Sequence, residues 1–213
     1  MVEHKNISQA VIKRLPRYYR YLGDLLENGV DRISSSKLSE LMSITASQIR
    51  QDLNNFGGFG QQGYGYNVSY LHEEIGNILE LHNERNMIVI GAGNVGRAIS
   101  NHTDFYKIGI KVTAIFDNNL DAIGTKINEI EVFAVDKLVE YIENNKVDIV
   151  AITVPKDSAV RVAAAVVEVG VKAIWNFAPV DLNVPQGITV ENVHLTDSLM
   201  TLSYNMNNEC KIK

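Results

Sequence analysis

A glycine-rich turn that directly follows a short apolar run constrains the fold of this chain more than any other feature. Residues 87–90 read Met-Ile-Val-Ile, and the next six residues carry glycine at their first, third and sixth positions. Glycine at this spacing permits a tight turn, lets a phosphate approach the backbone and lets a helix pack closely on a strand. We predict a dinucleotide-binding turn, and a glycine turn without a ligand is the alternative. The predicted contacts are Gly91, Ala92, Gly93, Asn94, Val95 and Gly96.

Apolar runs and helical patterns alternate from this turn onward. The runs are nearly continuous, as in parallel strands that are buried on both faces. This alternation predicts a Rossmann-like, doubly wound α/β sheet, and a last helix is expected at 197–208. The expected strands are 87–91, 111–116, 147–154, 172–176 and 188–191, and the expected helices are 94–101, 136–145 and 157–169.

An acidic residue after the second expected strand indicates which dinucleotide binds. Asp117 lies at about the expected distance from the glycine turn and is followed by Asn118. A carboxylate there accepts hydrogen bonds from the adenosine ribose and repels a 2′-phosphate, so we predict NAD(H) and not NADP(H). Two more segments end strands where ligands bind such sheets, although both could equally be ordinary loops. Their residues are Thr153, Val154 and Pro155, and Asn176, Phe177, Ala178 and Pro179.

The first 80 residues follow a helical pattern instead. We expect helices at 8–28, 35–43 and 46–55, with Pro16 causing a kink or a late start in the first. Thr45 and Gln48 have the spacing of a capping box at the start of the third helix. A short turn before that helix is typical of a helix-turn-helix. Its buried side holds Ile49 and Leu53, and Ser47, Gln48, Arg50, Gln51 and Asn54 are expected to face outward.

The segment after these helices is rich in glycine and aromatic residues. Residues 56–68 contain five glycines and four aromatic side chains. Glycine permits a tight hairpin, and aromatic rings can pack on the helices. We interpret the segment as the wing of a winged helix. A flexible linker is the alternative, but linkers rarely carry four aromatic residues. A connecting helix is expected at 69–85.

Positive charge is concentrated in the N-terminal part. Residues 1–70 carry eight Lys or Arg against six Asp or Glu, which is +2. Because the whole chain has a net charge of −5, the remaining residues carry −7. This asymmetry favours double-stranded DNA as the partner of the N-terminal part, although a solvated helix face could also produce it. The expected contacts are Lys13, Arg14, Thr45, Ser47, Gln48, Arg50, Gln51, Gln62, Gly63 and Tyr64.

Several classes of protein are not supported. A dehydrogenase usually places a histidine or lysine with a carboxylate near the nicotinamide, and no such arrangement is evident among the five histidines. No metal-ligand cluster is apparent, and the single cysteine, Cys210, excludes an internal disulfide. No signal peptide or membrane-spanning run is present. We expect a cytoplasmic protein without catalytic or metal-binding residues, which uses its two parts as a sensor.

With these residues considered together, the whole chain resembles the Rex family of bacterial redox-sensing transcriptional repressors. The N-terminal resemblance rests on the first helix, the recognition helix and the wing. The C-terminal resemblance rests on the glycine turn and the ends of later strands. The matching segments are 14–22, 49–53, 56–57, 59–60, 63–66, 90–96, 116–117, 153–155, 176–179, 182–185 and 191–193.

The resemblance implies a homodimer that binds an inverted-repeat operator and represses genes of fermentation and anaerobic metabolism. NADH would release the DNA and NAD⁺ would permit binding, so the protein would read the ratio of the two regulatory ligands. The resemblance also implies three parts. These are a winged-helix DNA-binding domain at 1–80, a Rossmann-like domain at 85–192 and a C-terminal helix at 193–213 that swaps onto the partner.

The chain departs from the family pattern at several positions. The family usually carries basic residues where this chain has Gln51 and, in the wing, Gln61 and Gln62. The family also places a hydrogen-bond switch at Arg20 and at the positions of His102 and His194, where it tends to have Tyr and Asp. Because histidine titrates near neutrality, we expect a less sharp, pH-dependent response to NADH.

Two alternatives stay open. One is a relative that binds DNA with a weak or absent redox response. The other is a small NAD-dependent oxidoreductase with a helical dimerisation arm, which the basic first helix, the capped third helix and the wing argue against.

Overall fold

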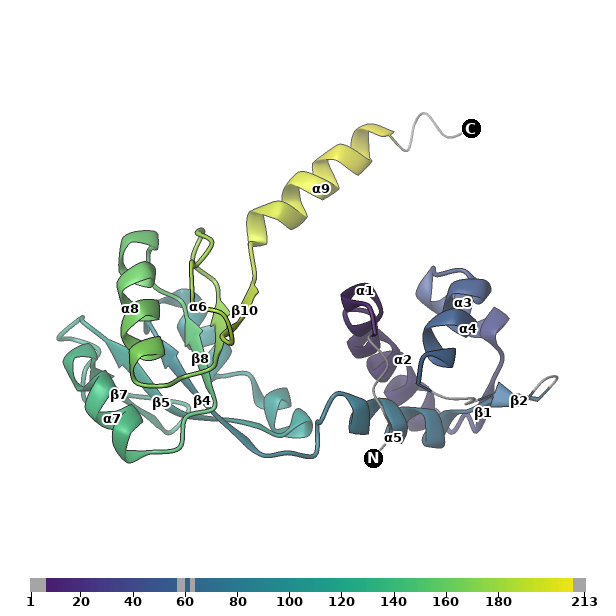
Figure 1. Ribbon diagram of the computed structural model, residues 1–213, viewed down its shortest axis with the longest axis horizontal. Helices are drawn as coiled ribbons and strands as arrows, with labels where there is room; N and C mark the ends of the chain where they lie inside the picture. The colour runs from purple at the N-terminus through teal and green to yellow at the C-terminus, as the bar shows by residue number, and fades with distance from the viewer. Residues whose placement is uncertain (1–6, 57–59, 62–63, 209–213) are drawn as a thin grey trace. The chain divides into compact units, whose positions relative to one another are not determined.

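The computed structural model describes residues 7–56, 60–61 and 64–208, and the chain divides into two compact units, residues 1–83 and 84–213 (Figure 1). Each unit has buried hydrophobic clusters of its own. A separate core in each unit is what allows each to fold as a domain. No helix among the described residues combines the length and the apolar character needed to cross a bilayer.

Unit 1 is a set of helices with a small antiparallel sheet. The order of its strands is β1-β3-β2, and its helices pack around a single cluster of apolar side chains. The elements are α1 (Gln9–Ile12), α2 (Leu15–Glu27), β1 (Arg32–Ile33), α3 (Ser35–Met42), α4 (Ala46–Asn54), β2 (Gly60–Gln61), β3 (Gly65–Asn67) and α5 (Val68–Ile78).

The first expected helix is two helices in the structure. The chain leaves α1 at Lys13, and α2 starts afresh with Pro16 in its first turn. Proline is tolerated there because a first-turn N–H has no partner within the helix. The prediction of one helix over 8–28 is therefore wrong, and the late start that Pro16 suggested is confirmed. The connecting helix, expected to reach residue 85, ends at Ile78.

The core of unit 1 lies between α2 and the other helices. Leu15, Tyr18 and Leu22 form the buried side of α2, as their helical spacing predicts. Leu38 and Ile49 contribute from α3 and α4. The start of α3 is fixed by Ser34, whose hydroxyl accepts a hydrogen bond from the backbone N–H of Lys37 at 3.1 Å.

Unit 2 is built on a seven-stranded sheet in the order β10-β9-β8-β4-β5-β7-β6. All pairs are parallel except β6 with β7. The chain builds the sheet outward in both directions from β4, which confirms the doubly wound prediction. The elements are β4 (Arg85–Ile90), α6 (Asn94–Ser100), η1 (Thr103–Ile108), β5 (Ile110–Asp117), β6 (Lys126–Ile127), β7 (Ile130–Ala134), η2 (Val135–Lys137), α7 (Leu138–Asn144), β8 (Ile149–Ile152), α8 (Lys156–Glu168), β9 (Ala173–Asn176), β10 (Thr189–Asn192) and α9 (Leu195–Asn208).

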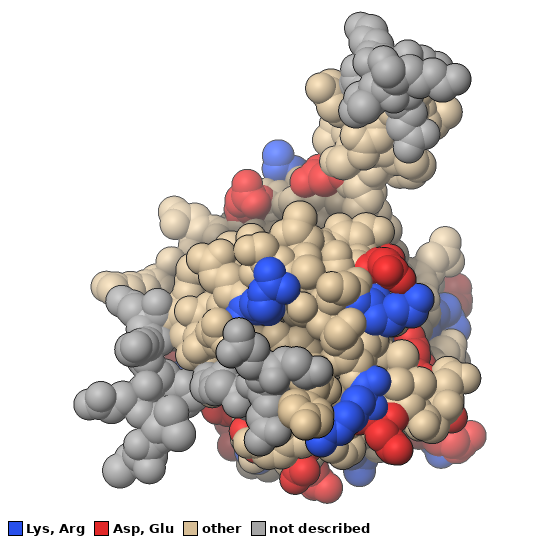
Figure 2. Space-filling model, turned by 90° about the vertical axis from the view of Figure 1, so that its right-hand side faces the viewer, with Lys and Arg blue, Asp and Glu red and all other residues tan. Residues whose placement is uncertain are grey.

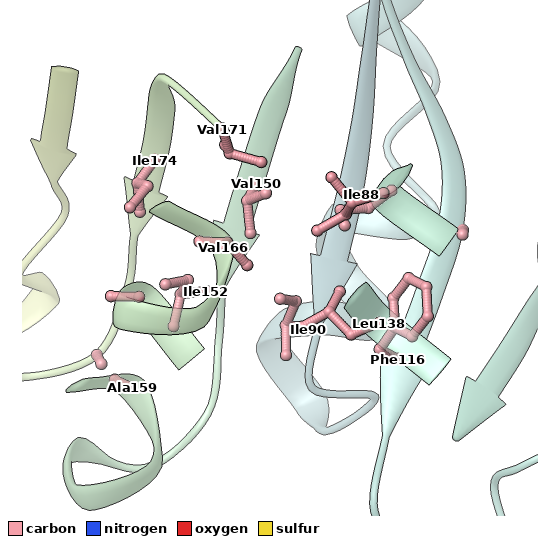
Figure 3. Packing of buried hydrophobic residues seen from close by; sticks show 14 residues of the cluster. Ile88, Ile90, Phe116, Leu138, Val150, Ile152, Ala159, Val166, Val171 and Ile174 are labelled. Carbon is pink, nitrogen blue, oxygen red and sulfur yellow. The ribbon is translucent and has the colours of Figure 1, made fainter. Parts of the chain in front are cut away.

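Both faces of the sheet are buried by alternate residues of the same strands. On one face, Ile88 and Ile90 of β4 join Phe116, and Leu138 of α7 and Val166 of α8 cover them (Figure 3). On the other face, a second cluster includes Met87, Val89 and, from α6, Ile99. Burial on both sides explains why these strands read as continuous apolar runs.

The β6–β7 hairpin was not expected from the sequence. Its two-residue turn has Asn128 at φ 49° and Glu129 at φ 62°. Such turns need positive φ at both positions and are usually marked by glycine, which this turn lacks. The strands are also only two and five residues long, so the pattern is too short to be detected.

The last helix, α9, follows β10 and runs away from the sheet (Figure 1). Its side chains from 195 to 206 are all exposed. Leu195, Leu199, Leu202 and Met206 are 63%, 64%, 55% and 69% exposed. Their spacing places them along one side of the helix. A row of large apolar side chains in water is a feature of interaction surfaces.

Candidate functional site

Helix α4 begins with a cap that the sequence predicts only in part. The Thr45 hydroxyl accepts a hydrogen bond from the backbone N–H of Gln48 at 3.2 Å. A complete capping box also requires the Gln48 side chain to return to the backbone of Thr45. Instead, its Nε2 donates to Asp52 Oδ1 at 2.7 Å. The second half of the predicted capping box is therefore wrong, because an ionised carboxylate one turn further along is a strong acceptor.

Asp52 is the centre of a network that joins α4 to α2. Its side chain is fully buried. Arg14 donates from Nε to Oδ2 at 2.6 Å and from Nη2 to Oδ1 at 2.7 Å. The Tyr18 hydroxyl donates to Oδ2 at 2.9 Å. With the bond from Gln48, each carboxylate oxygen accepts two hydrogen bonds, which is what a buried charge needs.

The network shifts the pKa values of its members so that the ion pair is favoured. Burial acts to raise the pKa of Asp52, but hydrogen bonds from Arg14, Gln48 and Tyr18 outweigh it and lower that pKa. Burial and the bond to Asp52 raise the pKa of Tyr18. Because the carboxyl pKa is lowered, Asp52 stabilises unit 1 above its unfolded-state pKa, and this contribution is lost as the pH falls through the folded-state value.

Two residues expected to contact nucleic acid are therefore directed inward. Arg14 and Gln48 both bind Asp52, and the Arg14 side chain is only 29% exposed. The expectation that Gln48 faces outward is not met, and the guanidinium of Arg14 is held by α4. A long-range pair of this kind leaves no local pattern in the sequence.

The other predicted contacts in the described part of unit 1 lie at the surface. Arg50 is exposed, and its Nη1 donates to the Ser35 hydroxyl at 2.9 Å, which ties it to the first residue of α3. Tyr64 is 71% exposed. Gln62 and Gly63 lie outside the described residues. Lys13, Thr45, Ser47 and Gln51 are exposed.

Arg32 is a surface cation that the sequence analysis did not single out. It lies on β1, is exposed, and donates from Nη1 to the carbonyl oxygen of Tyr64 at 3.4 Å. A strand of two residues gives no signal that would have placed it there. On the face shown in Figure 2, the Lys and Arg side chains of the described residues are interspersed with Asp and Glu. We therefore expect only a modest sequence-independent attraction to DNA.

The glycine turn of unit 2 has the geometry that its spacing predicts. Gly91 has a φ of 107°, which an L side chain rarely adopts. A Cβ at Gly96 would lie 1.8 Å from the carbonyl oxygen of Gly91, so helix and strand touch there. A Cβ at Gly93 would meet no atom within 4 Å, so this backbone is open to a ligand. Asn94 and Val95 are exposed at the start of α6.

Asp117 is bonded to the glycine turn. Its Oδ2 accepts a hydrogen bond from the backbone N–H of Ala92 at 2.5 Å, and its Oδ1 accepts one from Asn119 at 2.7 Å. An ionised carboxylate has about four acceptor positions, so both oxygens can still accept from a sugar hydroxyl. The Arg97 side chain, which the sequence analysis missed, donates from Nε to the Ala92 carbonyl at 2.9 Å.

A pocket of about 360 Å³ lies beside Asp117 at the carboxyl ends of β5 and β8. Four predicted residues line it, namely Asp117, Asn118, Val154 and Pro155. Its apolar wall suits a flat ring, and its few polar groups can orient one. Ser158 and Arg161 of α8 also line the pocket, although the sequence analysis did not identify them. The remaining lining residues are Ile90, Phe116, Val135, Leu138, Val139, Val162 and Ala165.

Thr153 and Asn176 are directed away from any open site. The Thr153 hydroxyl lies 3.0 Å from the carbonyl oxygens of both Ile90 and Gly91. Asn176 is fully buried, and its Nδ2 donates to the Val180 carbonyl at 2.7 Å and to Asn192 Oδ1 at 2.8 Å. The expectation that Asn176 lines the ligand site with a free side chain is not met, because the amide organises the loop that follows β9.

The rest of that loop is partly accessible. Ala178 is buried and donates its backbone N–H to Asn176 Oδ1 at 3.0 Å, whereas Pro179 is exposed. The ring of Phe177 meets Trp175 edge-on, with centroids 4.5 Å apart. Trp175 in turn lies 5.8 Å from Phe105. A row of aromatic rings therefore connects this loop to η1.

The three predicted switch residues each have a neighbour within their own unit. His102 stacks on Phe105 with centroids 4.6 Å apart, and its Nδ1 accepts a hydrogen bond from the backbone N–H of Asp104 at 3.3 Å. His194 Nε2 lies 3.5 Å from Asp181 Oδ1. The Arg20 guanidinium lies 5.6 Å from the ring centroid of Tyr21. Asp181 was not anticipated, and it gives His194 an acidic neighbour.

Replacing Asp117 by asparagine is expected to weaken NADH binding about tenfold or more. The change removes the charge from the predicted acceptor of ribose hydroxyls, and a hydrogen bond to a charged group contributes about 1.5–3 kcal/mol. Because the repulsion of a 2′-phosphate is lost as well, the preference for NADH over NADPH should narrow. Titration with both nucleotides measures this. Asp121→Asn, which changes an exposed carboxylate nearby, is the matched control. Equal affinity of the unmodified protein for NADH and NADPH would contradict the role.

Metal binding gains no support from the part of the chain that the structure describes. Those residues contain no group of three or more His, Cys, Asp or Glu that could hold an ion.

Comparison with known proteins extends over both units. A family model described as a putative DNA-binding protein N-terminus matches residues 6–54. A second family model, described as a CoA binding domain, matches residues 82–180. The first match includes the helix-turn-helix, and the second includes the glycine turn.

Full-length relatives and solved structures are also similar. The chain is 57% identical over 206 residues to the redox-sensing transcriptional repressor Rex of Clostridioides difficile (strain 630), covering 97% of this chain and 98% of that protein. It is 60% identical over 203 residues to the same repressor of Clostridium botulinum (strain Hall), covering 95% and 97%. RSP in complex with β-NAD⁺ and operator DNA superposes with a TM-score of 0.90 at 55% identity, covering 96% of this chain and 94% of that one. RSP in complex with β-NADH gives a TM-score of 0.90 at 51% identity, covering 98% and 100%.

Proposed function

Because this chain belongs to the Rex family of redox-sensing transcriptional repressors, we propose that it is a repressor that binds operator DNA through unit 1 and NAD(H) through unit 2. The observation that carries the proposal is the pairing of two sites in one chain. An exposed Arg50 lies on the second helix of a helix-turn-helix. A glycine turn with Asp117 bonded to it lies at the carboxyl end of β4.

The ligands act as regulators. RSP has been solved with β-NAD⁺ on operator DNA and also with β-NADH, and the match of this chain to both covers nearly its full length. NADH releases the DNA and NAD⁺ permits binding, so the ratio of the two sets the level of repression. Arg50, Thr45, Ser47 and Gln51 are the proposed DNA contacts in the described part of unit 1.

The functional form is a homodimer on an inverted repeat. A palindromic operator has two equal half-sites, and a twofold dimer has two equal DNA-binding domains. The apolar side of α9 supports this, because no other described residue covers it. Residues 193–213 are proposed to swap onto the partner.

The protein acts in the cytoplasm, where bacterial DNA lies, and does not turn over a substrate. The support for this is that its relatives are named as repressors. The small oxidoreductase remains the alternative from a different class. A turnover assay with NAD⁺ and NADH over a broad panel of alcohols, aldehydes and hydroxy acids would reveal it.

The sharpness of the NADH response depends on His102 and His194. His194 has an acidic neighbour in its own unit, because Asp181 Oδ1 lies 3.5 Å from its Nε2. We therefore expect a smaller loss of response than the histidine substitution alone implies. NADH titration of the DNA complex, in the unmodified protein and in His102→Tyr with His194→Asp, tests this.

The decisive experiment is operator binding by the purified protein, titrated separately with NADH and NAD⁺. NADH should dissociate the complex, and NAD⁺ should preserve it and compete with NADH. If neither nucleotide changes DNA binding, the protein is the alternative already described, a DNA-binding relative that does not sense redox state. Absence of any DNA binding would overturn the proposal.

Arg50→Ala should weaken operator binding by about 5- to 150-fold. An arginine suits the acceptors of guanine in the major groove, and such a contact contributes roughly 1–3 kcal/mol of discrimination. Binding curves on the operator and on a scrambled duplex measure the effect. Lys37→Ala, on the preceding helix, is the control, because Lys37 is exposed and pairs with Glu40 at 2.8 Å. An unchanged operator affinity for Arg50→Ala would mean that α4 is not the reading helix.

A further inference from the structure

Arg14 and Arg17, two of the basic residues near the start of α2, both donate hydrogen bonds to other parts of unit 1. Arg14 binds Asp52 of α4 through two parallel bonds of 2.6 and 2.7 Å. Arg17, one turn further along α2, donates from Nη2 to the carbonyl oxygen of Met42, the last residue of α3. Arg14, just before α2, and Arg17, within it, thus contact both helices of the helix-turn-helix.

We propose that Arg14 is a positioning residue for DNA recognition, which fixes the rotation of α4 through Asp52, and not a contact to DNA phosphate. The inference rests on the proposed function, because it assumes that α4 reads the operator. It assigns to Arg14 a role different from the one that its basic sequence context predicts.

The geometry of the pair supports this role. A guanidinium that faces a carboxylate with two parallel bonds fixes orientation as well as distance. Asp52 is two residues after Arg50, so the two side chains leave α4 on nearly opposite sides. A rotation of α4 that moved Arg50 in the groove would break both bonds between Arg14 and Asp52.

Burial of the pair supports it further. Among the described residues, Asp52 is the one Asp, Glu, Lys, Arg or His that is fully buried. A charge in that position is costly unless every acceptor is satisfied, and here Arg14, Tyr18 and Gln48 together satisfy it. Three of those four bonds come from Arg14, the N-cap of α2, and from Tyr18 within it, so the orientation of α4 is set mainly by the start of that helix.

The end of α3 shows a second contact of the same kind. Ser43, which follows α3, has a φ of 52° in the left-handed region. The chain turns there toward α4, and Arg17 holds the carbonyl oxygen of Met42 just before the turn. Helix α2 therefore holds α3 and α4 at their junction as well as through Asp52.

The two roles of Arg14 predict different dependences on salt. A cation that neutralises a DNA phosphate adds about one unit to the slope of log affinity against log salt. A cation that is already neutralised by Asp52 adds nothing to that slope. Positioning acts instead on the ratio of operator affinity to non-specific affinity, because non-specific binding tolerates a rotated α4.

The variants are Arg14→Lys, Arg14→Gln, Asp52→Asn and the double variant Arg14→Gln with Asp52→Asn. Lys13→Gln is the matched control, because Lys13 is the adjacent, exposed cation. Affinities for operator and scrambled duplex are measured over a salt series in the full-length protein. Thermal unfolding and NADH affinity are measured in parallel to monitor folding.

We expect Arg14→Lys and Arg14→Gln to lower the operator-to-scrambled ratio about tenfold or more, with the salt slope unchanged. Lysine keeps the charge but lacks the planar fork, so it should not rescue the ratio. The double variant should lose little more than either single variant, because both changes remove one interaction. Lys13→Gln should leave the operator-to-scrambled ratio unchanged. If Lys13 contacts phosphate, this variant should reduce the salt slope by about one.

Several outcomes would overturn the inference. A slope that falls by about one in Arg14→Gln and is restored in Arg14→Lys would identify a phosphate contact. Equal losses on both duplexes, in parallel with lower thermal stability, would identify a purely structural role. If Arg14→Gln fails to fold, Arg14→Lys decides between these outcomes. Failure of the unmodified protein to bind operator would instead overturn the proposed function itself.

Discussion

Gly96→Ala is expected to abolish NAD(H) binding at micromolar nucleotide and to destabilise unit 2. The added Cβ would lie 1.8 Å from the Gly91 carbonyl oxygen and 2.9 Å from the Thr153 hydroxyl. A backbone atom cannot move aside as the end of a side chain can, so α6 or β4 must shift. Overpacking costs typically about 1–3 kcal/mol, and this contact should reach the upper end. This cost falls on the stability of unit 2. Because the shifted turn no longer presents its backbone to the nucleotide, we also expect the affinity for NAD(H) to fall about 100-fold or more.

Gly93→Ala is the matched variant for that experiment. A Cβ there meets no atom within 4 Å, and the residue has a φ of −73° that alanine adopts freely. We expect the unfolding temperature to be unchanged while NADH binding weakens, because the methyl group occupies the path of the ligand. NADH titration and thermal unfolding of both variants separate the two effects. Gly96→Ala with normal affinity and stability would show that the turn is not the binding element.

Charges on the apolar side of α9 should convert the proposed homodimer to monomers. Leu199→Asp with Leu202→Asp replaces two exposed leucines per chain, or four per dimer, by charged side chains that cannot be buried in the subunit contact. Burial of a leucine is worth roughly 1.5–3 kcal/mol. The dimer should therefore weaken by about four orders of magnitude or more, and operator affinity should fall with it.

Sedimentation at micromolar concentration measures this change, and operator binding is measured on the same samples. Ser198→Asp with Asn205→Asp adds the same charge to other positions of the same helix and should remain dimeric. An unchanged dimer in the leucine variant would refute the role of α9 as the subunit contact.

The elements that the sequence predicts well are those whose pattern is local. The strand from Met87 to Ile90 and the glycines at 91, 93 and 96 each constrain their neighbours directly, and the structure has the turn as expected. The β6–β7 hairpin was missed because its turn, Asn128 and Glu129, lacks the glycine that usually marks positive φ.

The part of the candidate sites that could not be predicted depends on contacts between distant segments. Arg14 and Asp52 are 38 positions apart, and nothing in either neighbourhood indicates that the charges meet. Asn176 ends a strand as ligand-binding residues do, but its side chain is directed into the protein toward Asn192. Which way a strand-end residue points is decided by packing that the sequence pattern does not contain.

The row of rings that ends at Phe177 also gives the protein an optical property. Trp175 is its only tryptophan, and it touches Phe177 on the loop at the end of β9. Indole emission overlaps the absorption of reduced nicotinamide but not that of the oxidised form. Excitation energy can therefore be transferred from Trp175 to bound NADH, but not to bound NAD⁺. The unlabelled protein should report which of the two nucleotides it holds by the quenching of its own fluorescence.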